Sequence, residues 1–125
     1  MRGDAALPRG FLRPCVLLLL RERSSHGYDL LERLPPLGFE PTDPGRLYRT
    51  LRALETGGLA RSAWEQSESG PARRVYEITR EGMEELHAFA SDLHEAQVTL
   101  GRFLGRYGEF AAIATPVGER TPLPR

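Results

Sequence analysis

The chain has 125 residues and a mass of 14.0 kDa, with a hydrophobic fraction of 40%, which suits one compact domain rather than a two-domain enzyme. Its formal net charge is zero because 17 arginines balance 17 acidic residues. The single cysteine, Cys15, excludes an intrachain disulfide and favours a reducing, cytoplasmic location. Lysine and asparagine are both absent, which is typical of a protein from a GC-rich bacterial genome.

The apolar run Cys15–Leu20 follows several arginines and so has the general form of a signal peptide. An h-region needs roughly 7–15 apolar residues and a bilayer span about 20, and this run is shorter than either. Charged residues end it at Arg21-Glu22-Arg23. We therefore expect a helix buried in a soluble core.

Two helices are predicted in the first third of the chain. The first runs from about Phe11 to Arg23, with Pro14 in its first turn, where a missing N–H is harmless. The second runs from Tyr28 to about Leu34, and Ser25 is the expected N-cap. Pro35-Pro36 should end this second helix.

The third helix has the clearest boundaries. Asp43 is a good N-cap, Pro44 suits the first helical position, and Gly57-Gly58 supplies a C-terminal stop. Between these limits one apolar face recurs at helical spacing, formed by Leu47, Leu51 and Leu54.

The pattern then changes to two short strands, 59–65 and 73–79, joined by a polar turn, and a long helix follows over 80–110. This order predicts a mostly α fold with a small β-hairpin: a winged helix-turn-helix plus a long C-terminal dimerisation helix. The expected organisation is a flexible N-terminal arm (1–10), a DNA-binding domain (11–79), the dimerisation helix (80–110) and a disordered tail (111–125).

The last helix carries an apolar face too broad for a simple two-stranded seam, and the small domain before it cannot cover so long a helix. A partner chain is the obvious cover. The residues expected at this dimer interface are Met83, Leu86, Phe89, Ala90, Leu93, Leu100, Phe103, Leu104 and Tyr107.

Net neutrality conceals a basic region and an acidic one. Residues 44–74 hold six arginines against three acids, whereas residues 80–110 hold three arginines against six acids. On the third helix the arginines lie opposite the leucine face, where they could enter a major groove or clamp phosphates. A solvated charged surface is the alternative interpretation, and the arginines of the hairpin favour DNA contact.

The residues predicted to contact DNA come from the third helix and from the hairpin. In the hairpin only one of two adjacent arginines is expected to face DNA, because neighbours on a strand point to opposite faces. The predicted set is Gly45, Arg46, Tyr48, Arg49, Arg52, Ser69, Gly70, Arg73 and Arg74.

Four segments, in this order and spacing, resemble the PadR family of transcriptional regulators, in its short form with one helix after the wing. They are Ser25-His26-Gly27-Tyr28-Asp29-Leu30, Asp43-Pro44-Gly45-Arg46-Leu47-Tyr48-Arg49-Thr50-Leu51, Leu54-Glu55-Thr56-Gly57-Gly58-Leu59 and Glu68-Ser69-Gly70-Pro71-Ala72-Arg73-Arg74-Val75-Tyr76. The resemblance implies a homodimer on the last helix, a recognition helix beginning near Gly45, and repression of nearby promoters. Pro35-Pro36 departs from the more helical sequence usual in this family.

The resemblance also implies a small-molecule effector in some members. The candidate pocket here would lie between the first and last helices at the dimer interface, with Phe89, Phe103 and Tyr107 as aromatic walls; simple interface packing is the alternative. His87 and His94 are two helical turns apart, about 10 Å, too far to share one metal ion within a chain. Cys15 has apolar neighbours, which favours an inert thiol over a redox switch.

No constellation of catalytic residues is recognisable, and no cofactor or metal is expected. The sequence predicts a DNA-binding regulator whose partners are a double-stranded operator, a second copy of itself and a candidate effector. The alternatives are a winged-helix adaptor that binds only proteins and a small ligand-carrier dimer.

Overall fold

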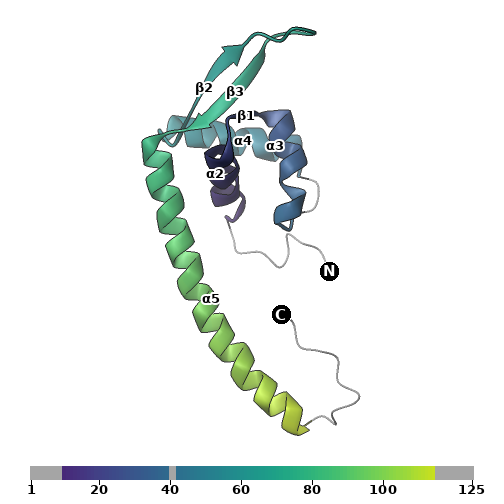
Figure 1. Cartoon of the computed structure of the whole chain (residues 1–125), viewed down its shortest axis with the longest axis vertical. Helices are drawn as coiled ribbons and strands as arrows, with labels where there is room; N and C mark the ends of the chain where they lie inside the picture. Colours follow the sequence, from purple (N-terminus) through teal and green to yellow (C-terminus); the bar gives the residue numbers. More distant parts are fainter. Residues whose placement is uncertain (1–9, 40–41, 115–125) are drawn as a thin grey trace. The chain divides into compact units, whose positions relative to one another are not determined.

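The computed structural model describes residues 10–39 and 42–114, with side chains through residue 109. In chain order its elements are α2 (Leu12–Glu22), β1 (Ser25–His26), α3 (Gly27–Arg33), the 3-10 turn η1 (Pro35–Leu37), α4 (Pro44–Thr56), β2 (Ala60–Glu65), β3 (Arg73–Ile78) and α5 (Arg80–Ala114) (Figure 1). The fold is a winged helix-turn-helix followed by a long helix, as predicted. Most of the predicted arm and residues 115–125 of the predicted tail lie outside the described residues.

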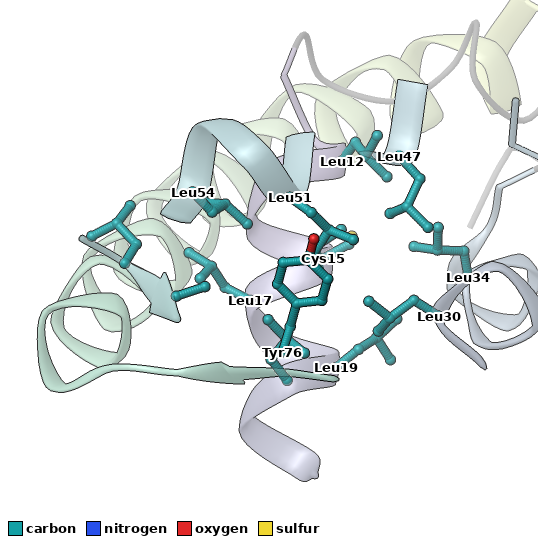
Figure 2. Packing of buried hydrophobic residues seen from close by; sticks show 14 of the residues in the cluster. Leu12, Cys15, Leu17, Leu19, Leu30, Leu34, Leu47, Leu51, Leu54 and Tyr76 are labelled. Carbon is teal, nitrogen blue, oxygen red and sulfur yellow. The ribbon is translucent and has the colours of Figure 1, made fainter. Parts of the chain in front are cut away.

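The core of the winged helix-turn-helix forms around α2. Its apolar run is buried on nearly every side, with Val16 and Leu17 fully inaccessible and only Leu18 exposed. Leucines from α3 and α4 pack against it, together with Tyr76 of β3 (Figure 2). None of the described helices is long and apolar enough to cross a membrane.

The start of α3 differs from the sequence prediction. Ser25 was expected to cap this helix, but it is buried in β1, where it pairs with Tyr76. The next residue, His26, is the N-cap, and its Nδ1 accepts a hydrogen bond from the backbone N–H of Asp29 at 3.3 Å. A histidine side chain thus satisfies the free N–H that serine or aspartate usually satisfies at this position.

Helix α4 follows the sequence prediction at both ends. The Asp43 carboxylate accepts a hydrogen bond from the Arg46 N–H at 3.1 Å, and Pro44 occupies the first turn. The helix ends at Gly57. Leu47, Leu51 and Leu54 are completely buried, so one face of α4 is committed to the core and the opposite face is free for other contacts.

The sheet has three antiparallel strands in the order β1-β3-β2. β2 and β3 form the predicted hairpin, in register from Ala60 opposite Ile78 to Glu65 opposite Arg73. The two-residue strand β1, which the sequence did not predict, pairs with β3 only at Val75 and Tyr76. This short pairing joins the wing to the turn between α2 and α3.

Helix α5 begins with a side-chain cap from Thr79, whose Oγ1 accepts from the Gly82 N–H at 3.0 Å and donates to the Gly58 carbonyl at 2.6 Å. The helix continues to Ala114, four residues beyond the predicted end at 110. The chain divides into two units at Phe89 and Ala90. In the first unit, Leu86 packs against the core and Glu85 pairs with Arg13 at 3.0 Å.

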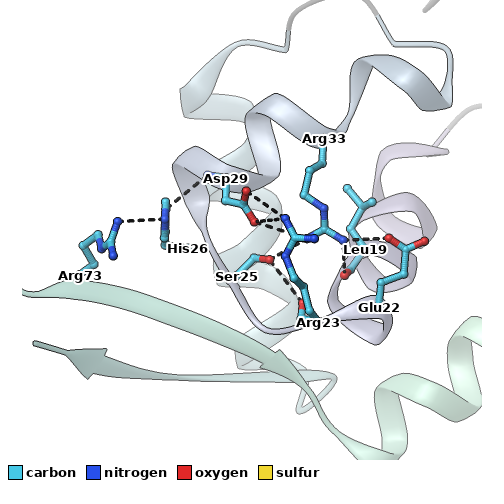
Figure 3. Close-up of polar contacts among 8 residues, drawn as sticks. All are labelled: Leu19, Glu22, Arg23, Ser25, His26, Asp29, Arg33 and Arg73. Carbon is cyan, nitrogen blue, oxygen red and sulfur yellow. Dashed lines mark hydrogen bonds and ion pairs between the residues drawn. The ribbon is translucent and has the colours of Figure 1, made fainter. Parts of the chain in front are cut away.

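A polar network joins the end of α2 to α3 (Figure 3). Arg33, mostly buried, donates to the Ser25 hydroxyl at 2.7 Å, to the Leu19 carbonyl at 3.0 Å and to Glu22 at 2.8 Å. Asp29 pairs with Arg23 at 3.2 Å. Burial by itself raises the pKa of Asp29, but the Ser25 hydroxyl and the charges of Arg23 and Arg33 together hold that pKa below its usual value.

Replacing this carboxylate, Asp29→Asn, should lower the free energy of unfolding by about 1 kcal/mol at pH 7, since charged hydrogen bonds are lost. A carboxyl whose folded pKa is depressed stabilises the fold above its unfolded pKa of about 3.9, and loses that effect as pH falls through the folded value. The difference between the variant and the parent should therefore shrink below about pH 4. Urea unfolding at pH 7 and pH 3, at fixed protein concentration, measures this; an equal difference at both pH values would contradict it.

A second stability prediction concerns Gly82, which lies where α5 meets the turn after α4. A Cβ at this position would overlap the Leu59 carbonyl oxygen and lie 2.7 Å from Cγ1 of Ile78. Gly82→Ala should therefore cost about 1–3 kcal/mol in urea unfolding, since backbone must shift. Gly105→Ala is the matched control, because nothing lies within 4 Å of a Cβ there, and it should be neutral or stabilising by up to about 1 kcal/mol. Equal stability of the two variants would refute the close contact.

Candidate nucleic-acid interface

The face of α4 opposite its buried leucines is formed by arginines and small residues. Arg46, Arg49 and Arg52 are all exposed, as are Gly45 and Ala53 between them. Within the described residues, the side chains of Arg49 and Arg52 form no ion pair, so their charge is available to an anionic partner. Small neighbours let the helix backbone approach a surface closely, which a helix lying in a major groove must do.

The side chain of Arg49 lies over the first turn of α4. A Cβ on Gly45 would be 3.3 Å from Nη1 of Arg49, so the guanidinium lies close above this glycine. The positive end of the helix dipole is in the same turn, and the Asp43 carboxylate accepts the Arg46 N–H there. Oδ2 of Asp43 would be 3.1 Å from the same Cβ, so this carboxylate offsets part of the positive potential of the first turn.

The two adjacent arginines of the wing have different partners. Arg74 lies over the ring of Trp64, with 5.4 Å between the guanidinium carbon and the ring centroid, and its Nη2 is 3.8 Å from Glu55. Arg73 extends from the other face of β3, and its Nη1 is 3.2 Å from Nε2 of His26. Arg74 is thus partly neutralised within the chain, whereas no carboxylate pairs with Arg73 among the described residues.

Tyr48 lies at the border between the buried and exposed faces of α4. Its ring packs against the backbone of Gly27, where a Cβ would lie only 2.6 Å from Cε1 of the tyrosine. A side chain at position 27 would therefore displace the Tyr48 ring from this place. Ser69 and Gly70, at the tip of the hairpin, are both exposed.

The predicted interface residues of α5 do not all have the same environment. Leu86, in the first unit, is partly covered by the core of its own chain, and Met83 is exposed. In the second unit the apolar side chains are open, with Leu100 60% and Phe103 65% exposed. The rings of Phe103 and Tyr107 stack with 6.4 Å between their centroids.

The three aromatic residues predicted to form an effector pocket belong to different units of the chain. Phe89 belongs to the first unit, whereas Phe103 and Tyr107 lie in the second. Phe103 and Tyr107, together with Arg102 and Arg106, line an open depression of about 500 Å³. The structure therefore groups two of the predicted aromatic residues with two arginines that the sequence prediction did not include.

The other reactive side chains are not organised into a site. Cys15 is buried, and burial raises the pKa of its thiol to about 11, so it is protonated at neutral pH. His87 and His94 are exposed. Across residues 10–39 and 42–114, no three histidine, cysteine or acidic side chains gather in a way that could hold a metal ion.

This geometry agrees with the result of comparing the chain with known proteins. Residues 16–88 match the transcriptional regulator PadR-like family. The chain belongs to this family. PadR-like proteins are regulators of transcription rather than enzymes, which confirms the prediction that the chain is not an enzyme.

Solved structures of PadR-like proteins share the fold. A PadR family transcriptional regulator from Eggerthella lenta is 34% identical, with a TM-score of 0.67, over 77% of this chain and 83% of its own. A PadR-like transcriptional regulator from Bacillus cereus is 28% identical, with a TM-score of 0.70, over 77% and 93% of the two chains. No curated protein is significantly similar to this chain.

Three residues beside the arginines of the wing were not among those predicted from the sequence to contact DNA. His26 contacts Arg73, Trp64 supports Arg74, and Tyr28 is 70% exposed beside them. The only signal available for Trp64 was a large aromatic residue on a short strand of the wing, which strand propensity explains equally well. His26 and Tyr28 come from the α3 segment, and only the folded chain places them beside the wing.

Proposed function

We propose that this PadR-like protein is a homodimeric, bacterial, cytoplasmic repressor that binds an inverted-repeat operator. Helix α4 would enter the major groove, with Arg46, Arg49 and Arg52 facing the bases and phosphates. The hairpin tip, with Ser69 and Gly70, would reach the flanking groove and touch phosphate. Repression, rather than activation, is what the resemblance to the family implies.

One observation carries the DNA-binding part of the proposal: α4 is divided into two opposite faces. Its leucine face is completely buried, so the helix has a fixed orientation on the domain. Its arginine face is exposed and includes Gly45 in the first turn of the helix. A rigid helix that presents arginines and small residues suits the major groove better than it suits a protein partner, since protein interfaces are rich in aromatic anchors.

The homodimer would use the second half of α5. Its exposed leucine and aromatic side chains form an extended apolar surface rather than isolated single residues. Another chain normally covers such a surface in water. A second copy presents the same surface and satisfies it symmetrically. A two-fold dimer then presents two copies of α4, and their half-sites should be inverted and about 10 bp, or a small multiple, apart.

A small-molecule effector, if the protein responds to one, would bind at Phe103 and Tyr107. Their stacked rings offer an apolar surface for an aromatic compound. Arg102 and Arg106 border the same depression and favour an anionic group on that compound. Binding there would act on DNA affinity by changing how the two copies pack.

The recognition-helix assignment predicts the effect of Arg49→Ala on operator binding. If Arg49 reads a base, the variant should lose about 1–3 kcal/mol of binding free energy and its preference at one position. If Arg49 touches only phosphate, the loss should be uniform across sequences and the salt slope shallower. Footprinting on DNA upstream of the protein's own gene, followed by titrations from 50 to about 200 mM salt, measures both.

Arg80→Ala is the matched control, because it removes the same charge from an exposed side chain that pairs with Glu84 on α5. It should bind the operator like the parent. Unchanged affinity of Arg49→Ala would refute the recognition-helix assignment. Absence of any duplex binding at moderate salt would favour a winged-helix adaptor that binds only proteins.

If the protein is a dimer, we expect sedimentation or light scattering at micromolar concentration to give a mass of about twice 14.0 kDa. Leu100→Glu should shift this mass to that of the monomer, because a charge in an apolar interface is heavily penalised. The side chain is exposed within one chain, so the helical circular dichroism signal of the winged domain should persist. Val98→Glu is the control, because Val98 is exposed and lies two residues from Leu100, on the opposite side of α5, and it should remain dimeric. A monomeric parent would overturn the proposal.

A further inference from the structure

A depression of about 400 Å³ lies on the first unit, where the start of α3, the side of α4 and the outer half of the hairpin meet. Its walls are aromatic and basic, and no aspartate or glutamate among the described residues lines it. Its lining includes His26, Tyr28, Tyr48, Trp64, Arg73 and Arg74. We propose that this depression binds one backbone phosphate of the operator, with His26, Tyr28 and Arg73 as its ligands; the inference rests on the proposed function.

The contact between His26 and Arg73 is the main reason. The backbone N–H of Asp29 donates to Nδ1 of His26, so in the neutral ring the proton is on Nε2. Nε2 faces Nη1 of Arg73 at 3.2 Å (Figure 3). Both groups are then donors, and two donors cannot bond to each other. An acceptor placed against both nitrogens resolves the conflict, and a phosphate oxygen is such an acceptor.

The opposite tautomer does not remove the need for an acceptor. If Nε2 accepted from Arg73, the protonated Nδ1 would face the Asp29 N–H instead, and the cap of α3 would be lost. In either state two donors, the Asp29 N–H and Arg73, face two ring nitrogens of which only one can accept. An anion beside Nε2 keeps the helix cap intact and satisfies Arg73 as well.

The surrounding charges leave the depression positive. Asp29 is the acid nearest to His26 in the sequence, and its carboxylate forms ion pairs with Arg23 and Arg33. Glu55 is 3.8 Å from Arg74, on the other face of β3 from Arg73. Arg73 therefore remains the one wing arginine whose charge no described carboxylate offsets, and a phosphodiester complements it.

The aromatic walls suit the parts of a DNA strand on either side of a phosphate. Trp64 is 66% exposed with Arg74 held over its ring, and it offers a flat apolar surface to a deoxyribose. Tyr28 is still more exposed, and its hydroxyl is free to donate to a phosphate oxygen. Tyr48, packed on Gly27, fixes the distance between this depression and Arg49, the next residue of α4. A phosphate held here would set how deeply α4 enters the groove.

Three single substitutions test the site on the operator duplex by fluorescence anisotropy. Arg73→Gln should weaken binding about tenfold, as expected when a hydrogen bond between charged groups is lost. His26→Asn keeps a good capping residue but withdraws Nε2, and Tyr28→Phe removes only a hydroxyl; each should weaken binding about threefold to tenfold. All three losses should be equal on operator and on unrelated duplex, since phosphate contacts carry no sequence information.

Arg61→Gln is the matched control, because this β2 arginine bonds Glu77 at 2.6 Å and does not line the depression. It should bind within about twofold of the parent, which a purely long-range charge effect would not allow. Thermal melts by circular dichroism check that each variant is folded. If His26→Asn unfolds, the exposed positions Arg73 and Tyr28 decide the question.

Operator duplexes with one neutral methylphosphonate at a time then locate the phosphate. One position should weaken the parent about tenfold and have no further effect on Arg73→Gln, because the two changes remove the same contact. If the parent binds the operator and Arg49→Ala weakens it, but no position shows this coupling, the phosphate site is wrong and the proposed function stands. If the parent binds no duplex, the proposed function itself fails.

Discussion

Two backbone pairs hold the wing to the helix-turn-helix: Ser25 with Tyr76, and His26 with Val75. Tyr76 is buried in the core, so this short pairing also fixes the hairpin relative to α2 and α4. The turn between α2 and α3 is held from its other side by Arg33, which bonds to Ser25 and to the end of α2. The position of the wing arginines relative to α3 depends on this pairing of β1 with β3, since it places Arg73 beside His26.

The elements with strong local signals could be predicted from the sequence. Helix α4 has a capping aspartate, a proline in its first turn and two glycines at its end, and the structure confirms each. The hairpin was also predicted, to within one residue at each strand end. In these places the residues that specify the element are its own, so no distant contact is needed to interpret them.

The remaining features depend on contacts between distant parts of the chain. Strand β1 has only two residues and exists because β3 lies beside it. The two strands are far apart in the sequence, since Arg73 of β3 is 47 positions from His26 of β1. His26, rather than Ser25, caps α3 because the pairing with Tyr76 buries the serine. Likewise, the apolar face predicted for α5 could not reveal that Leu86 packs on its own chain while Leu100 does not. Periodicity identifies an apolar face but not what covers it.

In the proposed dimer, α5 would link DNA binding to assembly. Its first turns are anchored to the winged domain through Glu85 and Leu86, and its later turns present exposed leucine and aromatic side chains. One continuous helix thus connects the domain that carries α4 to the surface that a second copy would cover. Any change in how two such helices pack would move one α4 relative to the other, and a rise of 1.5 Å per residue makes small shifts matter against a fixed half-site spacing. For a regulator built this way, the interface is the most direct place for a signal to change operator affinity.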